Sequence, residues 1–292
     1  MGKYLFFDID GTLMGKSRRI TEKTKQALQK ARENGHKIFI CTGRSPAFIV
    51  GDVKHVEFDG GDVKHVEFDG VVSAAGSFVN IGNQYIFEHY MESHLVEQVM
   101  ELFKKHHLLF TLETRDVVYQ SPGAEEFFEQ KNSKELQNNP ELMRYQEATR
   151  RQQQRKPLEQ FDITSQKVAK MCYIAPKKEQ FLPCIPFLEK NFYIVKFSRE
   201  EDSFLNGEII LKDCTKGDGI RKVIEYFHGD MKDTIGFGDS MNDYQMLEAV
   251  HTGVVFENAS EEIKKLAHHY FKEPDEDGIY QAMMELGLVE KF

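Results

Sequence analysis

Two aspartates directly follow a short apolar run near the amino terminus, and this arrangement constrains the fold most. Residues 4–7 (YLFF) are typical of a buried strand, and residues 8–12 (DIDGT) come next. Side chains two apart on a strand point the same way, so Asp8 and Asp10 can face one reaction centre. Gly11 then allows a sharp turn. Such paired carboxylates suit a nucleophile beside a proton donor, a magnesium site, or both, although an Asp-rich turn is the plainer alternative.

The first and last thirds of the chain alternate apolar runs with helical patterns. Near the start, helical spacing over 20–31 and a stop at Gly35 lead to an apolar run at 37–41. The last third predicts strands at 208–211, 234–238 and 254–255, and helices at about 216–227, 244–249 and from 278. Strand–helix–strand units imply parallel strands with right-handed crossovers. We therefore predict an α/β fold with a doubly wound, mostly parallel, Rossmann-like sheet.

The middle of the chain has a different character. It predicts a helix near 95–103, strands at 108–112, 117–119, 168–174 and 192–197, and a helix at 181–188. We read this as an inserted α+β domain, with residues 1–83 and 205–292 forming the core and residues 84–204 forming the insert. Within it, residues 149–156 are rich in arginine and glutamine but lack aromatic residues, which favours an exposed surface over an RNA-binding patch.

Composition narrows the class of protein. The net charge of -9 argues against a nucleic-acid partner. No run approaches the roughly 18 apolar residues of a membrane helix, and the chain enters a strand at once, without a signal peptide. The four cysteines are scattered and form no CxxC pair. We expect a cytoplasmic protein with free thiols and no membrane segment, and the sequence sets no oligomeric state.

A ten-residue segment is duplicated. Residues 51–60 (GDVKHVEFDG) recur identically as residues 61–70. Two copies are too few for a stacked repeat array, and His55 and His65 meet no known metal-ligand spacing. We expect a local duplication that lengthens a loop, with only the second copy leading into a strand near 71–72.

Four short elements fall where the expected strands or helices of the sheet begin or end. They are residues 8–12 (DIDGT), 42–44 (TGR), 216–217 (KG) and 238–243 (GDSMND). Alone, each has an ordinary explanation as a turn, a solvated charge or a helix cap. Ligands of such sheets bind outside the carboxyl ends of the strands, so the four elements together predict one site.

In these four elements the chain resembles the haloacid dehalogenase superfamily, and within it the Cof-type phosphatases with an α/β cap of type IIB. The family order of DxDGT, Thr, Lys and GDxxND is complete, and the resemblance spans nearly the whole chain. Two positions depart from it. Glu257 stands where the family usually has glycine, and Ala75-Gly76 stands where it commonly has Asn-Gly.

The resemblance implies roles for the acidic residues and the lysine. Asp8 would attack phosphorus to give an aspartyl-phosphate, and Asp10 would protonate the leaving alcohol and then activate water. Mg²⁺ would be held by Asp8, the backbone carbonyl of Asp10 and Asp239. Asp243 would support this metal site and orient Lys216.

The resemblance also implies a phosphoryl-binding set. Thr42, the following backbone amides beginning at Gly43, and Lys216 would bind the phosphoryl oxygens. Asn242 would contact phosphate or position the nucleophile. Arg44 would either approach the substrate or form a surface ion pair. The insert would act as a cap that excludes water and selects the substrate.

These roles predict a Mg²⁺-dependent phosphatase that acts on small phosphorylated metabolites, with sugar phosphates the usual substrates of relatives. A phosphomutase shares the aspartate pair and remains an alternative. A non-catalytic phosphate-binding or interaction protein on the same fold is a second alternative, because fold alone does not fix function.

Overall fold

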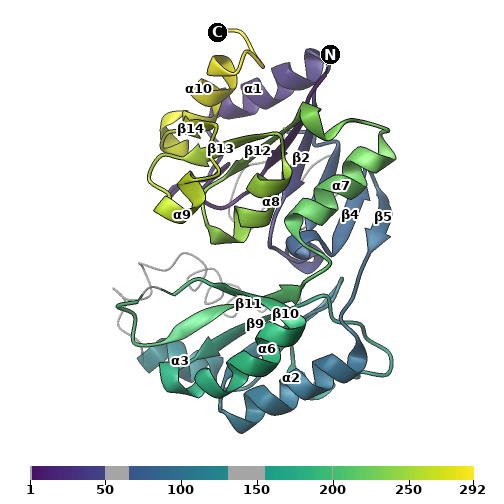
Figure 1. Ribbon diagram of the computed structural model, residues 1–292, viewed down its shortest axis with the longest axis vertical. Helices are drawn as coiled ribbons and strands as arrows, with labels where there is room; N and C mark the ends of the chain where they lie inside the picture. Colours follow the sequence, from purple (N-terminus) through teal and green to yellow (C-terminus); the bar gives the residue numbers. More distant parts are fainter. Residues whose placement is uncertain (1, 50–65, 131–154, 199) are drawn as a thin grey trace. The chain divides into compact units, whose positions relative to one another are not determined.

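The computed structural model describes residues 2–49, 66–130, 155–198 and 200–292, which form two compact units (Figure 1). Unit 1 comprises Met1–His89 and Asp213–Phe292, and unit 2 comprises Tyr90–Lys212. The predictions for the first copy of the duplicated segment, for the start of the second copy and for most of residues 149–156 lie outside the described residues.

Unit 1 contains an eight-stranded sheet in the order β14-β13-β12-β1-β2-β3-β4-β5. Neighbours from β14 to β3 run parallel, whereas β4 and β5 are antiparallel additions. Its strands are β1 (Tyr4–Phe7), β2 (Lys37–Cys41), β3 (Gly70–Ser73), β4 (Phe78–Ile81), β5 (Gln84–Glu88), β12 (Thr234–Gly238), β13 (Thr252–Phe256) and β14 (His269–Phe271). Its helices are α1 (Glu22–Glu33), α7 (Lys216–Tyr226), α8 (Tyr244–Ala249), α9 (Glu261–Lys264) and α10 (Gly278–Glu285). The predicted doubly wound, mostly parallel sheet is confirmed.

Helices cover both faces of this sheet because its central strands are apolar on both sides. Leu5 and Phe7 of β1 belong to one buried cluster with residues of α1 and α10. Phe6 points to the opposite face and joins a second cluster with residues of α7 and α8. Each fully buried phenylalanine contributes roughly 1.5–3 kcal/mol from the removal of its apolar surface from water. The alternation along one strand therefore stabilises both helical layers.

Unit 2 contains a six-stranded sheet in the order β10-β11-β9-β6-β7-β8, antiparallel except for the β7–β8 pair. Its strands are β6 (Leu109–Glu113), β7 (Val118–Gln120), β8 (Arg155–Pro157), β9 (Lys170–Ala175), β10 (Phe192–Lys196) and β11 (Leu205–Leu211). Its helices are α2 (Ser93–Lys105), α3 (Ala124–Gln130) and α6 (Ile185–Asn191).

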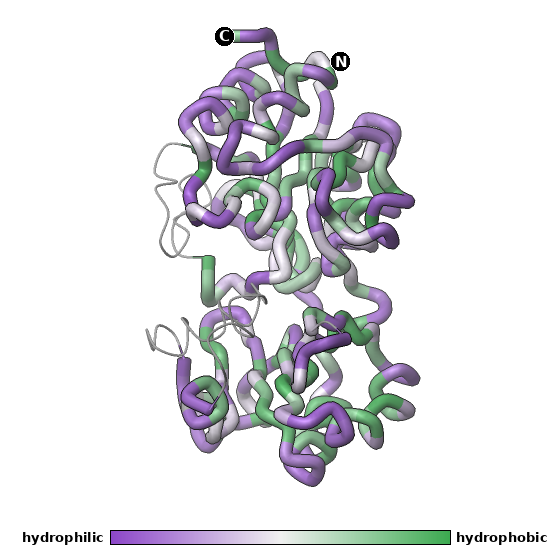
Figure 2. Tube along the Cα trace, turned by 90° about the vertical axis from the view of Figure 1, so that its left-hand side faces the viewer, coloured by the Kyte–Doolittle hydropathy of each residue, from purple (hydrophilic) through white to green (hydrophobic). Residues whose placement is uncertain are grey.

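An aromatic cluster ties the sheet of unit 2 to neighbouring segments. Phe103 of α2 packs on Phe110 and Tyr173, and Phe181 stacks on Tyr173 with ring centroids 4.4 Å apart. Hydrophobic segments recur through the interior of each unit, whereas hydrophilic ones lie toward its outside (Figure 2). The predicted α+β character of the insert agrees with this arrangement.

The boundaries of the two units differ from the expected ones. Residues 84–88, expected to open the insert, form β5 and pair with β4 in unit 1. Residues 205–211, expected to return to the parallel sheet, form β11 and pair with β10 and β9 in unit 2. The chain therefore passes between units after His89 and after Lys212. An apolar run has the same pattern in either sheet, so the sequence shows a strand there but not its partner.

No helix in the described ranges combines the length and the apolar character needed to cross a bilayer.

Candidate active site

Strand register brings three of the four sequence elements to one edge of the sheet in unit 1. Phe7 of β1 pairs with Phe237 of β12 and with Ile40 of β2. The backbone N–H of Asp8 continues the ladder by donating to the carbonyl of Phe237 over 3.0 Å. The residues that follow these three strands therefore lie beside one another at their carboxyl ends, as the sequence predicts.

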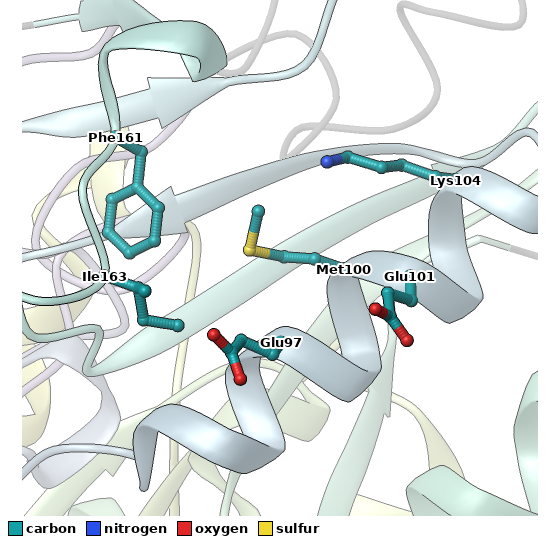
Figure 3. Close-up of a pocket in the computed structure, with 6 residues that line it drawn as sticks. All are labelled: Glu97, Met100, Glu101, Lys104, Phe161 and Ile163. Carbon is teal, nitrogen blue, oxygen red and sulfur yellow. The ribbon is translucent and has the colours of Figure 1, made fainter.

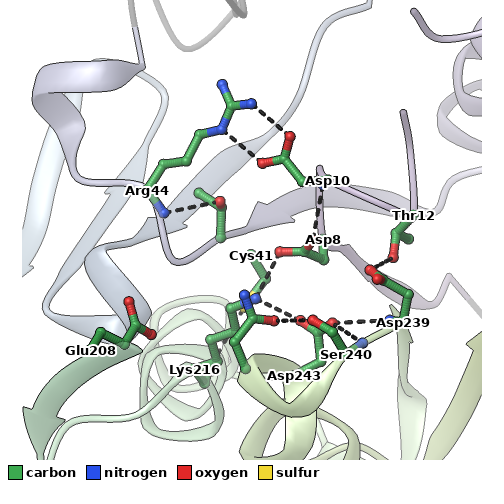
Figure 4. A network of polar contacts seen from close by, with 12 residues as sticks. Asp8, Asp10, Thr12, Cys41, Arg44, Glu208, Lys216, Asp239, Ser240 and Asp243 are labelled. Atoms are coloured by element: carbon green, nitrogen blue, oxygen red, sulfur yellow. Dashed lines mark hydrogen bonds and ion pairs between the residues drawn. The ribbon is translucent and has the colours of Figure 1, made fainter. Parts of the chain in front are cut away.

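A buried lysine bridges two carboxylates at this edge (Figure 4). The Lys216 Nζ lies 2.7 Å from Asp8 Oδ1 and 2.6 Å from Asp243 Oδ1. The side chains of all three residues are 3% exposed or less. Removing charged groups from water costs free energy that the attraction between them does not always offset. A fully buried cluster of three charged side chains is therefore better evidence of a functional site than of a stabilising interaction.

Lys216 is placed by the start of α7. Thr215 caps this helix, accepting from the backbone N–H of Asp218 while the Asp218 carboxylate accepts from that of Thr215. Gly76 packs directly against the cap, because a Cβ at residue 76 would lie 2.0 Å from the carbonyl oxygen of Thr215. Of the Ala75-Gly76 pair, which stands where the family commonly has Asn-Gly, it is therefore the glycine that packs against the helix start carrying Lys216.

Asp239 approaches the DIDGT turn closely. Its Oδ1 accepts from the Thr12 hydroxyl over 2.9 Å. Gly11 adopts φ +91°, and a Cβ there would lie 2.3 Å from Asp239 Oδ2. Thr12 is not among the predicted site residues, although its place at the end of the DIDGT motif is the available signal.

Asp243 is held by three donors. Its Oδ1 accepts from Lys216, and its Oδ2 accepts from the backbone N–H groups of Asp239 and Ser240 over 3.0 and 3.2 Å. Both oxygens of Asp243 are therefore engaged by the protein. This arrangement agrees with the supporting and orienting role that the family resemblance implies.

Burial and mutual interaction shift the pKa values of this cluster. Burial, together with the nearby charge of Asp8, raises the pKa of Asp243 to about 6. Burial alone would lower the pKa of Lys216, but the carboxylates of Asp243 and Asp8 outweigh it and raise that pKa above the ordinary value. Lys216 is consequently a fixed positive charge.

Three carboxylates of the site could hold a divalent metal. One oxygen each of Asp8, Asp239 and Asp243 lies within 4.8 Å of the others. Such oxygen donors suit Mg²⁺, a hard cation. Since Asp243 already accepts hydrogen bonds from three donors, Asp8 and Asp239 are better suited to bind the metal directly. The donor set therefore fits the ion.

The side chain of Asp10 lies outside this carboxylate cluster and pairs with Arg44. Arg44 Nε donates to Asp10 Oδ2 over 2.9 Å and Nη2 donates to Oδ1 over 2.7 Å. The backbone N–H of Arg44 donates to the Thr42 hydroxyl over 3.1 Å. Asn242 accepts from the Ser240 hydroxyl over 2.9 Å. Arg44 thus forms an ion pair, one of its two expected alternatives, within the site rather than on the open surface.

A separate pocket lies in unit 2 and contains none of the predicted site residues (Figure 3). It is lined by Glu97, Met100, Glu101, Lys104, Phe161 and Ile163. The lining combines the apolar side chains of Met100, Phe161 and Ile163 with the charged side chains of Glu97, Glu101 and Lys104.

Comparison with known proteins places this geometry in context. The family model for haloacid dehalogenase-like hydrolases matches residues 5–283. "Putative phosphatase YkrA" of Bacillus subtilis is 29% identical over 292 residues, with 99% of each chain covered. The solved structure of the subclass IIB sugar phosphatase BT4131 is 26% identical at a TM-score of 0.71, with 98% of this chain and 100% of that chain covered. A haloacid dehalogenase-like hydrolase from B. subtilis is 20% identical at a TM-score of 0.78, with 97% and 99% covered, and shows the shared fold.

Proposed function

Because this chain belongs to the haloacid dehalogenase-like hydrolase family, we propose that it is a Mg²⁺-dependent phosphatase that hydrolyses small phosphorylated metabolites through an aspartyl-phosphate. The match to the family model and the similarity to phosphatases show that the chain is a phosphomonoester hydrolase. The metal, the intermediate and the substrate are the proposed parts.

The observation that carries the proposal is the buried bridge from Lys216 to Asp8 and Asp243. A fixed ammonium beside the nucleophile would neutralise charge on the phosphoryl oxygens as they approach the Asp8 carboxylate. Asp243 holds the ammonium in place from its other side. An acidic chain of net charge -9 needs such local positive charge to accept an anionic substrate.

In the first step an oxygen of Asp8 attacks phosphorus, the bond from phosphorus to the substrate oxygen breaks, and Asp10 delivers a proton to that leaving oxygen. In the second step a water attacks the phosphorus of the aspartyl-phosphate and gives its proton to Asp10. Inorganic phosphate leaves and Asp8 is restored. Thr42 and the backbone after it would bind the remaining phosphoryl oxygens.

Mg²⁺, when bound, would supply positive charge that keeps Asp8 ionised and offsets the charge of the phosphoryl group. Asp8 and Asp239 would hold it, with the backbone carbonyl of Asp10 as a further ligand. The three clustered carboxylates support this assignment.

The proposed substrates are sugar phosphates. The support is the sugar phosphatase BT4131, which matches nearly the full length of this chain. Other small phosphate esters fall within the same proposal, since Asp8, Lys216 and Thr42 would contact the phosphoryl group and not the alcohol to which it is esterified.

The test is phosphate release from p-nitrophenyl phosphate and a panel of sugar phosphates, with Mg²⁺ and with EDTA. Asp8→Asn should lower release by at least about a thousandfold, because the nucleophile is lost. Asp233→Asn is the matched control, since Asp233 is also buried and paired with a lysine, Lys3, but lies just before the start of β12, whereas Asp8 follows the end of β1. Undiminished release by the Asp8 variant, or release unaffected by EDTA, would contradict the proposal.

A further inference from the structure

The loop that follows the DIDGT motif is bonded to the backbone of Asp8 and its neighbours. The N–H of Leu13 donates to the carbonyl of Asp8 over 3.3 Å, and the N–H of Met14 donates to the carbonyl of Ile9 over 2.8 Å. The N–H of Gly11 donates back to the carbonyl of Met14 over 2.8 Å. The chain therefore folds back on itself directly after β1, and a displacement of Met14 would move the segment that carries Asp8.

The far side of this loop is held by Asp275, which lies between β14 and α10. Ser17 donates to both oxygens of Asp275, from its N–H to Oδ2 over 2.9 Å and from its hydroxyl to Oδ1 over 2.5 Å. Hydrogen bonds to an ionised carboxylate are stronger than those between neutral groups. Gly15 packs against the same carboxylate, because a Cβ at residue 15 would lie 2.7 Å from Asp275 Cγ. One acidic side chain thus contacts the loop at two positions.

Asp275 can serve as an anchor because its own turn is closed by hydrogen bonds. In this tail turn, residues 273–278, two backbone N–H groups donate to the carbonyl of Glu273 over 3.0 and 3.2 Å. The tail turn also holds α1, since Asp277 Oδ2 lies 3.2 Å from Lys23 Nζ. Lys23 lies on the helix, beyond the loop that Ser17 belongs to. The two acids of the tail turn therefore hold different segments.

We propose that Asp275 is a positioning residue for the nucleophile: by fixing Ser17 and Gly15 it holds the loop after the DIDGT motif, and with it the Asp8 carboxylate, in the orientation for attack. This inference rests on the proposed function for the role of Asp8. Asp275 sets how fast Asp8 attacks phosphorus, whereas the phosphoryl-binding residues set how tightly the substrate binds.

The test separates attack from binding. Steady-state hydrolysis of p-nitrophenyl phosphate gives kcat, and inhibition by inorganic phosphate gives a binding constant that does not depend on attack. Asp275→Ala should lower kcat about tenfold or more, because a small displacement of a reacting group is costly in rate. It should change the phosphate inhibition constant less than about twofold. An unchanged kcat, or an equal loss of kcat and phosphate affinity, would overturn the proposal.

Gly15→Ala tests the contact from the other side. The added methyl group would push against the Asp275 carboxylate and displace the loop, so kcat should fall severalfold in the otherwise wild-type chain. In the Asp275→Ala background the carboxylate is absent, and the same change should cause little further loss. Equal losses in the two backgrounds would show that Gly15 does not act through Asp275, and the proposal would fail.

Asp277→Asn is the matched control, because it removes the other ion pair of the tail turn. Asparagine tolerates the positive φ of 63° at this position. The variant should keep the wild-type kcat, and comparable thermal unfolding of all variants would show that they fold. If Asp277→Asn lowered kcat as much as Asp275→Ala, a general loosening of the tail turn would explain both losses and the specific role of Asp275 would be refuted.

Amide hydrogen exchange over residues 8–14 provides a readout that needs no turnover. Asp275→Ala should speed exchange at the N–H groups of Leu13 and Met14 about tenfold or more, because the loop opens more often once its anchor is lost. Asp277→Asn should leave this exchange unchanged. Unchanged exchange in Asp275→Ala would overturn the proposal whatever the activity. Faster exchange in a chain that hydrolyses nothing would refute the proposed function and leave the anchoring of the loop standing.

Discussion

Because residue 11 is glycine and has no side chain, the DIDGT motif can lie close to Asp239 of the GDSMND motif. A Cβ at this position would lie 2.3 Å from Asp239 Oδ2, which is closer than a Cβ atom approaches another heavy atom, so one of the two groups would have to move. A side chain there would push the Asp239 carboxylate away from Thr12 and from the proposed metal ligands. Glycine at this position is thus required by proximity as well as by its positive φ.

Gly11→Ala should therefore lower the rate of phosphate release by at least about tenfold and weaken Mg²⁺ binding, since displacement of a site group by about 1 Å can cost a hundredfold in rate. Gly35→Ala is the matched control. Gly35 has a similar φ of +85° but nothing within 4 Å of its built Cβ. Its alanine variant should lose stability from backbone strain and keep its activity. Equal activity losses in both variants would contradict this account.

The raised pKa of Asp243 predicts a pH dependence of metal binding. A carboxyl group with a pKa of about 6 retains its proton to higher pH than an ordinary aspartate. As pH falls through 6, Asp243 gains a proton, and the site loses one of the negative charges that balance Lys216 and a cation. Mg²⁺ affinity should therefore fall below pH 6 and level off above it.

Calorimetric titration with Mg²⁺ between pH 4.5 and 8 checks this expectation. Asp243→Asn is nearly isosteric and cannot titrate, so it should remove the inflection near pH 6 and bind Mg²⁺ more weakly at neutral pH. A wild-type affinity that does not change across this range would refute the prediction.

At the scale of elements, β11 decides where the insert ends. It pairs along its length with β10 on one side and β9 on the other. Its removal would leave β10 without a partner and would expose one edge of β9. Each unpaired backbone group that stays buried would cost free energy comparable to a lost hydrogen bond.

Two fragments should behave differently for this reason. The fragment 90–212 retains all six strands and should unfold cooperatively on heating, because a compact unit with its own core can fold alone. The fragment 84–204 has nearly the same length but lacks β11, and should show no cooperative transition. Circular dichroism during a thermal scan would distinguish them, and a folded 84–204 fragment would show that the boundary is drawn wrongly.

At the scale of the whole molecule, the sequence predicts much of the fold and of the site residues. The strands β1, β2 and β12 are apolar on both faces, and this pattern is visible in the sequence itself, so the parallel sheet can be predicted from it. Asp8, Asp10, Asp239 and Thr42 can be placed together because the strand ends of a parallel sheet converge, whereas Lys216, at the start of α7, is named from the family order of motifs. Their individual roles remain predictions.

What the sequence leaves open depends on contacts between distant segments. The partner of β11, the approach of Asp239 to Gly11 and the capture of Asp10 by Arg44 each join residues whose types are compatible with several neighbours. Patterns of period two or 3.6 predict an element and its buried face. They do not identify which strand or charge it meets.

Unit 1 is assembled from two chain segments, and this order has a consequence for biosynthesis. During translation the nucleophile Asp8 emerges early, followed by the whole of unit 2, and Lys216, Asp239 and Asp243 emerge last. Until β12 is made, β1 has an unpaired edge in the growing chain. Unit 2 can fold first, as domains generally do during synthesis, and the nascent protein carries its reactive aspartate without the lysine and carboxylates that would make it work. A chain whose synthesis ends just before residue 216 therefore has a complete insert and an incomplete active site.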